Sequence, residues 1–235
     1  MGRCRRGGMI PLRDNLPSST LPVVTVLLIL ACTAVFLHVY YGLPSDAAAQ
    51  RVLMHYGATP SHLLAPGGLA QASPTLVTSL FLHGSWLHLG GNMLYLWIFG
   101  DNVEGWMGHI GFLVFYLLSG AVATVSHALL NPTSTAPLVG ASGAIAGVLG
   151  AYLVLFPRAR IRSLAILGFY VTTVSIPAVV YLPLWFLLQF FSGVASLESG
   201  MGGGGVAWWA HVGGFVTGIV LVPVFARRRG NQAAW

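Results

Sequence analysis

Residues 142–156 read SGAIAGVLGAYLVLF, an apolar segment that begins at a serine and ends before Pro157. An α-helix rises about 1.5 Å per residue, so this segment covers about 22 Å of a hydrocarbon core that is about 30 Å thick. If the proline end lies at one membrane surface, Ser142 lies about 8 Å below the other. Irregular backbone at that depth is tolerated only against protein or a water-filled cavity. We therefore expect residues 131–139 to dip into the membrane and Ser142 to face a sunken aqueous pocket.

The whole chain has the composition of a membrane protein. Of its 235 residues, 56% are apolar and 7% are charged, whereas a soluble domain carries about 25% charged residues. So few charges cannot cover a water-facing surface, and lipid must be the main solvent. The net charge of +6 does not indicate nucleic acid, because the arginines cluster at the ends of apolar segments and no nucleic-acid-binding motif is visible.

The apolar segments predict an all-α fold, a polytopic membrane bundle with six transmembrane helices. The expected helices cover residues 21–41, 76–99, 109–130, 142–156, part of 163–192, and 206–225. Residues 1–20 and 227–235 are expected to be basic cytoplasmic tails on either side of one membrane domain, residues 21–226. Arginines form three clusters, before the first span (Arg3, Arg5, Arg6 and Arg13), after the fourth (Arg158, Arg160 and Arg162) and after the last (Arg227, Arg228 and Arg229). With six spans, both termini and all three clusters fall on one side, which the positive-inside rule makes cytoplasmic.

Strongly polar side chains within apolar segments are expensive in a bilayer and by default mark a functional site. Four stand out, namely His88, Asn92, Ser142 and His211. His88 and Asn92 are four residues apart, so they share one face of a helix. Interhelical hydrogen bonding would explain that pair equally well.

Ser142 and His211 have the residue types of an activated nucleophile and its base. A pair of glycines spaced four apart follows each of them, Gly143 and Gly147 in one case and Gly214 and Gly218 in the other. Such pairs let helix backbones pack closely. If the two helices meet, the imidazole can take the serine proton and later deliver it to a leaving amine. The serine also begins its helix, where the amide dipoles favour the charge of a tetrahedral oxyanion.

Carboxylates are missing where other protease mechanisms need them. All five fall in predicted tails or loops, namely Asp14, Asp46, Asp101, Glu104 and Glu198. A serine–histidine dyad is therefore favoured over a triad, and an aspartyl intramembrane protease is disfavoured. No H-E-x-x-H motif occurs, and a zinc site of His83, His88 and His211 would lack an acid or thiolate partner. We expect neither a metal nor a cofactor.

Four motifs resemble signatures of the rhomboid family of intramembrane serine proteases, and they occur in the family's order. Residues 83–93, HGSWLHLGGNM, resemble H-x4-H-x3-N of the second span, and residues 99–104, FGDNVE, resemble the turn that follows it. Residues 140–143, GASG, match G-x-S-G. Residues 210–218, AHVGGFVTG, match A-H-x-x-G-x-x-x-G of the last core span. The resemblance covers about residues 76–225.

The resemblance implies an activity and its residues. Ser142 would be the nucleophile, and His211 would be the general base and acid. His88 and Asn92, with the Ser142 amide, would stabilise the oxyanion. The expected partners are membrane proteins with a transmembrane helix, which the family cleaves within or beside the bilayer, and the lipid bilayer itself, without nucleic acid. The expected location is multi-pass in a bacterial plasma (inner) membrane with both termini cytoplasmic.

The resemblance also implies supporting roles. His83 would be structural, and Glu104 would brace the loop between spans two and three. Residues 202–205 would let the loop before the last span move as a lid, and the fifth span would be the lateral gate. The chain departs from some members at Ala146, where an aromatic that stacks on the histidine is replaced.

Two other functions are compatible with a polytopic membrane chain. An inactive relative could bind membrane clients, but such proteins usually lack the serine or the histidine, and both are present here. A small transporter or channel would need charged groups deep in several spans and a repeat across the halves, and neither is evident.

Overall fold

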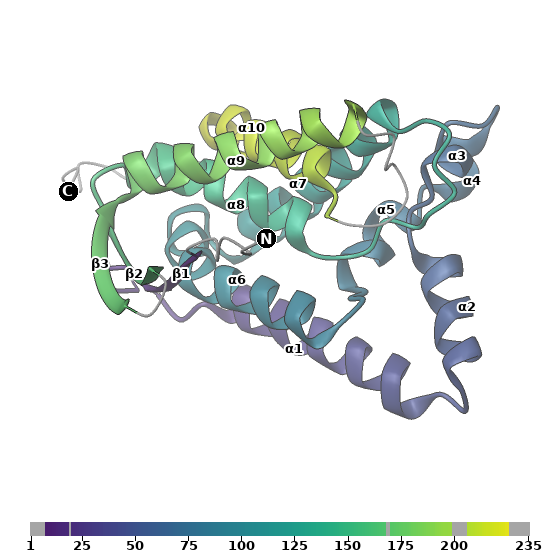
Figure 1. Cartoon of the computed structure of the whole chain (residues 1–235), viewed down its shortest axis with the longest axis horizontal. Helices are drawn as coiled ribbons and strands as arrows, with labels where there is room; N and C mark the ends of the chain where they lie inside the picture. The colour runs from purple at the N-terminus through teal and green to yellow at the C-terminus, as the bar shows by residue number, and fades with distance from the viewer. Residues whose placement is uncertain (1–7, 19, 168–169, 199–205, 226–235) are drawn as a thin grey trace, which may run out of the picture.

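The fold is that of a computed structural model, which describes residues 8–18, 20–167, 170–198 and 206–225. A helical bundle forms its centre, with short helices at one end and a small sheet at the other (Figure 1). The elements follow one another as β1 (Gly8–Arg13), α1 (Val23–Leu37), the π-helical turn η1 (His38–Gly42), α2 (Asp46–Tyr56), α3 (Pro60–Leu63), α4 (Gly68–Ala72), α5 (Thr75–Thr78), the 3-10 turn η2 (Ser79–Phe81), α6 (Trp86–Met107), α7 (His109–Leu130), α8 (Ser142–Leu155), β2 (Arg160–Leu167), β3 (Tyr170–Pro177), α9 (Ala178–Glu198) and α10 (Trp208–Phe225).

Several of these helices suit a membrane. Four in the described ranges are long and apolar enough to cross one, namely Val23–Gly42, His109–Leu130, Ala178–Leu197 and Trp208–Phe225. The expectation of six spans also needs α6 and α8. α8 is apolar but has only 14 residues, and the 22 residues of α6 include Asn92, Asp101 and Glu104. The chain is thus a mostly helical membrane protein, and its six-span topology stays a proposal.

The second expected span, residues 76–99, lies further along the chain than the sequence suggested. α6 begins at Trp86, because the Ser85 hydroxyl caps it by accepting from the His88 amide at 3.1 Å. It then continues through the polar residues that were expected to form a turn, and Gly108, with φ 76°, separates it from α7. Polar side chains can lie in this helix because they have hydrogen-bond partners. For example, Nδ2 of Asn102 donates to Oδ2 of Asp14 at 2.9 Å.

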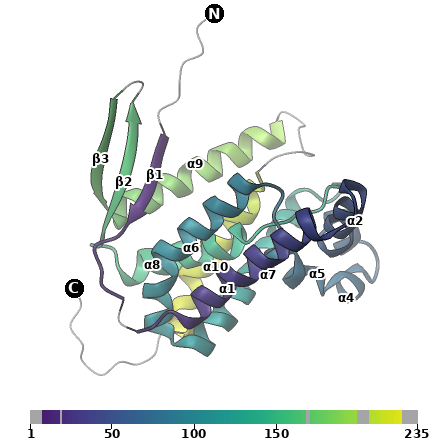
Figure 2. The same ribbon diagram turned by 90° about the horizontal axis from the view of Figure 1, so that it is seen from below.

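The expectation of an all-α fold is wrong for two parts of the chain, which form a three-stranded antiparallel sheet in the order β1-β2-β3. β1 comes from the expected N-terminal tail, and its Ile10 lies opposite Leu164 of β2. β2 and β3 form a hairpin within the region expected to hold the fifth span, so that span begins only at Ala178. Figure 2 shows the sheet standing beside the start of α9, away from α2–α5.

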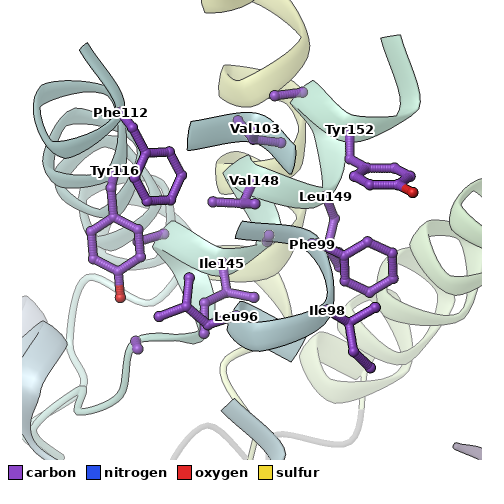
Figure 3. Close-up of a cluster of buried hydrophobic side chains, with 14 of the residues drawn as sticks. Leu96, Ile98, Phe99, Val103, Phe112, Tyr116, Ile145, Val148, Leu149 and Tyr152 are labelled. Carbon is purple, nitrogen blue, oxygen red and sulfur yellow. The ribbon is translucent and has the colours of Figure 1, made fainter. Parts of the chain in front are cut away.

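The core is organised around α8. Every residue of α8 from Gly143 to Tyr152 is buried. Large apolar side chains from α6 and α7 surround it, including Phe99, Phe112 and Tyr116 (Figure 3). A helix that is apolar all round is the kind that a bundle buries at its centre. The short α8 is therefore held by protein on its sides, which fixes the position of its first residue, Ser142.

Glycines bring α8 and α10 into backbone contact, as their spacing predicted. A Cβ added at Gly214 would lie 2.0 Å from the carbonyl oxygen of Gly143, and one added at Gly218 would lie 2.0 Å from that of Gly147. A Cβ at Gly150 would lie 2.2 Å from the carbonyl oxygen of Phe215. No side chain fits at these three positions, so the glycines set the separation of the two helices.

Glu104 joins three helices from a fully buried position. Its carboxylate accepts from the amides of Val24 and Thr25 at 2.8 and 2.7 Å and from the Thr25 hydroxyl at 2.7 Å. These amides belong to the first turn of α1, which has no acidic residue of its own there. Glu104 also contacts Nδ1 of His109 at 2.6 Å. It therefore caps α1 from a neighbouring helix, a wider role than bracing the loop between spans two and three.

Glu104→Ala is expected to lower the free energy of unfolding by about 3–5 kcal/mol, because it leaves buried helix-end donors without an acceptor. A denaturant titration of the purified protein in detergent micelles would measure the loss. Asp46→Ala, which removes an exposed carboxylate from the first turn of α2, should cost about 1 kcal/mol or less. Equal losses in the two variants would contradict the capping role.

Candidate active site

Ser142 is the first residue of α8, as the sequence predicted, and it stands at the end of an irregular loop. Gly140, two residues earlier, has φ +124°, a conformation that favours glycine. Its amide donates to the Ser79 carbonyl at 2.9 Å, which ties the loop to the turn before α6. The hydroxyl of Ser142 thus lies where the first amides of α8 are free of helical partners, an environment that favours negative charge.

His211 reaches Ser142 from α10. Its Nε2 lies 2.8 Å from the Ser142 Oγ, and the imidazole is buried. The contact follows from the packing of α8 on α10, because Gly143 and Gly214, one and three residues beyond the pair, touch through their backbones. A serine and an imidazole at hydrogen-bond distance can form a nucleophile–base pair.

His88 and Asn92 lie on the facing side, in the first two turns of α6. A Cβ at Gly140 would lie 2.6 Å from Nε2 of His88 and 3.7 Å from Nδ2 of Asn92, so only a glycine leaves room for both groups. The Gly84 amide donates to Nδ1 of His88 at 3.5 Å, which leaves the proton of a neutral ring on Nε2. Nδ2 of Asn92 is buried and has no hydrogen-bond partner in the described part of the chain. Two donors therefore converge beside the loop that precedes Ser142.

All four sequence-predicted residues line one cavity of about 660 Å³. Residues of α6, α8, α9 and α10 line the cavity, together with residues 137–139 of the loop. A pocket was expected at Ser142, and this residue lines the cavity. The lid expected at residues 202–205 falls outside the described residues.

Sequence reasoning missed two further residues that contact His211, Gln189 and Trp185, both on α9. Oε1 of Gln189 lies 2.7 Å from Nδ1 of His211 in a buried contact. The ring centroid of Trp185 lies 5.8 Å from that of His211, with the planes tilted by 34°. The sequence did contain a signal that could have identified Gln189 as a site residue. Its amide side chain interrupts a long apolar run, as the polar side chains of the four predicted site residues do.

The remaining histidine of the second motif lies beside His88. His83 is buried, and its ring centroid lies 5.2 Å from that of His88. Within the residues that the structure describes, no group of three or more His, Cys, Asp or Glu side chains could hold a metal ion. The geometry thus gives no support to the zinc site of His83, His88 and His211.

Comparisons with known proteins agree on one family. A family model for the Rhomboid domain matches residues 71–228, about two thirds of the chain. Rhomboid protein 1, mitochondrial, from Saccharomyces cerevisiae is 39% identical over 37% of this chain and 26% of its own length. Rhomboid-like protein 11, chloroplastic, from Arabidopsis thaliana is 31% identical over 64% of this chain and 52% of its own length. Rhomboid protease GluP from Bacillus subtilis is 38% identical over 43% of this chain and 18% of its own length. The chain thus spans about half or less of the length of these curated relatives.

Proposed function

This chain belongs to the rhomboid family, and from that premise we propose that it is an intramembrane serine endopeptidase. Its substrates would be membrane proteins, cleaved in a transmembrane helix within or next to the bilayer. The observation that carries the proposal is the 2.8 Å contact between the Ser142 hydroxyl and Nε2 of His211 at the wall of a 660 Å³ cavity. One relative is named as a protease, which supports the same activity.

In this mechanism His211 removes the proton of Ser142 as the hydroxyl attacks the scissile carbonyl. The serine oxygen bonds to the carbonyl carbon, and the carbonyl oxygen becomes an oxyanion. The protonated imidazole then gives its proton to the leaving amine, which departs and leaves an acyl-enzyme. Water then enters the cavity and gives a proton to His211 as its oxygen attacks the acyl carbon. His211 passes this proton to the serine oxygen as the ester bond breaks, which releases the acid product and restores the free serine.

The oxyanion would be stabilised by Nε2–H of His88, Nδ2–H of Asn92 and the Ser142 amide. Support comes from the convergence of the two side chains at Gly140 and from the helix start at Ser142. Donors that are fixed before the reaction stabilise developing charge without reorganisation. The positive end of the α8 dipole acts in the same direction.

The cellular setting is part of the proposal. Six spans, with α6 and α8 crossing beside the four apolar helices, would put both termini and the arginine clusters in the cytoplasm. Relatives are named as mitochondrial and chloroplastic, and another comes from a bacterium. The four long apolar helices support a membrane location, but the names of the relatives do not single out the bacterial plasma membrane that we expected.

Labelling with a fluorophosphonate probe tests the proposal, because the probe reacts covalently with activated serines. Purified wild-type protein in detergent should be labelled, and Ser142→Ala should not. The control Ser73→Ala removes an exposed hydroxyl that is distant from Ser142 in the chain, and it should be labelled as wild type is. A folded wild type that cleaves no transmembrane reporter and takes no label would favour an inactive client-binding protein instead.

His88→Ala and Asn92→Ala are each expected to lower kcat by about 100-fold, by analogy with the loss of one oxyanion donor in soluble proteases. The thermal unfolding midpoint should change little, since both groups border a cavity. Steady-state cleavage of a fluorogenic transmembrane peptide, beside unfolding curves, would check this. A large fall in stability with kcat unchanged would favour interhelical hydrogen bonding as their role.

A further inference from the structure

The imidazole of His211 is held at both nitrogens. Oε1 of Gln189, an amide oxygen, can only accept a hydrogen bond, so Nδ1 at 2.7 Å must carry the proton. The neutral ring then has its lone pair on Nε2, which faces the Ser142 hydroxyl at 2.8 Å. The contact with Gln189 thus selects the tautomer in which His211 can act as a base.

The face of the same ring is also covered from α9. Trp185 lies four residues before Gln189, so both side chains project from one face of the helix. The Trp185 ring lies 5.8 Å from that of His211, at an angle of 34°. On α8, the residue one turn after Ser142 is Ala146, which carries only a methyl group.

We propose that Gln189 is a positioning residue for the reaction, which holds His211 in its reactive tautomer and rotation while Trp185 limits the tilt of the ring. This inference rests on the proposed function. It makes α9 part of the apparatus that orients the base.

A neutral acceptor suits the location of the base. In the described part of the chain, none of the hydrogen bonds and ion pairs of His211 involves a carboxylate. Gln189 is 9% exposed, and a carboxylate buried there would be unpaired whenever the imidazole is neutral. An amide oxygen orients the ring at a smaller desolvation cost, and it still stabilises the imidazolium that forms during the reaction.

The test compares wild type, Gln189→Met, Gln189→Glu and the control Gln50→Leu. Methionine has a similar length but no strong acceptor, glutamate keeps an acceptor oxygen, and Gln50 is an exposed residue of α2. The measurements are the rate of fluorophosphonate labelling and the kcat and KM for a fluorogenic transmembrane peptide.

Gln189→Met should lower the labelling rate and kcat by about 100-fold while KM stays within about twofold, because loss of an orienting partner impairs the base rather than binding. For Gln189→Glu, the labelling rate and kcat should lie within about tenfold of the wild-type values. For Gln50→Leu, both should equal the wild-type values. A Gln189→Met rate close to that of wild type would overturn the inference, as would equal losses in Gln189→Met and Gln189→Glu. A wild type that takes no label would defeat the proposed function itself, so the two failures are distinct.

A second measurement avoids any effect of substitution on folding. In wild-type protein labelled with 15N-histidine, the resonances of His211, identified by their loss in His211→Ala, should show a neutral ring protonated at Nδ1. A ring protonated at Nε2 would overturn the inference.

Discussion

His211→Ala is expected to lower kcat for cleavage of a transmembrane substrate by about 10⁴- to 10⁶-fold, the range seen when one member of a serine-protease catalytic group is removed. The reason is the 2.8 Å contact of its Nε2 with the Ser142 hydroxyl, since without the imidazole no group accepts the serine proton. Cleavage in reconstituted vesicles, where the product is resolved on a gel, would measure the loss. The exposed His62 offers a matched control, and His62→Ala should cleave as wild type does.

The double variant with Ser142→Ala sharpens this prediction. Residues that act as one unit give non-additive losses, so the double variant should be no slower than the slower single variant. A further large drop in the double variant would mean that the two residues act independently. Activity near the wild-type level in His211→Ala would contradict a dyad altogether.

Gly218→Val is expected to have the second-largest effect, this time on both stability and activity. Even a Cβ at this position would lie 2.0 Å from the Gly147 carbonyl oxygen, so α10 must move away from α8. Overpacking against side chains costs about 1–3 kcal/mol, and a backbone carbonyl yields less than a side chain, so we expect about 3 kcal/mol or more. His211 lies two turns away on the same helix and would leave Ser142, which should abolish labelling by the probe.

Gly90→Ala is the matched control, because a Cβ there would have no atom within 4 Å apart from the adjacent backbone of its own helix. It should keep wild-type labelling and gain up to about 1 kcal/mol from the better helix propensity of alanine. Thermal unfolding followed by tryptophan fluorescence would compare the two variants. Similar unfolding midpoints for both would contradict the role of Gly218 in setting the helix separation.

The sequence was informative where local signals decide the structure. The limits of α7 were predicted because Asn131 and Pro132 stop the helix by turn chemistry and by loss of a backbone donor. The start of α8 at Ser142 and the close contact of α8 with α10 followed in the same way from residue types at fixed spacing. The candidate site was found because polar groups within apolar segments are conspicuous.

Non-local signals were harder to interpret. A continuous apolar run does not distinguish a buried strand from a helix, so the fifth span was expected in an undefined part of residues 163–192, and the strands β2 and β3 were not predicted. β1, the partner of β2, lies about 150 residues away in the chain, so no local sequence pattern indicates their pairing. Gln189 was missed for a related reason, since its role depends on how α9 faces α10, which the sequence of α9 alone does not specify.

The pairing of β1 with β2 also constrains the order of events during biosynthesis. Arg13 lies opposite Arg162, so the first strand must wait until the ribosome has made all of α1 to α8. At about 5–20 residues per second, the wait is about 8–30 s. Throughout that interval the N-terminal segment has no strand to pair with while helices enter the membrane. The sheet therefore joins the beginning of the chain to its middle only after the serine-bearing helix has been synthesised.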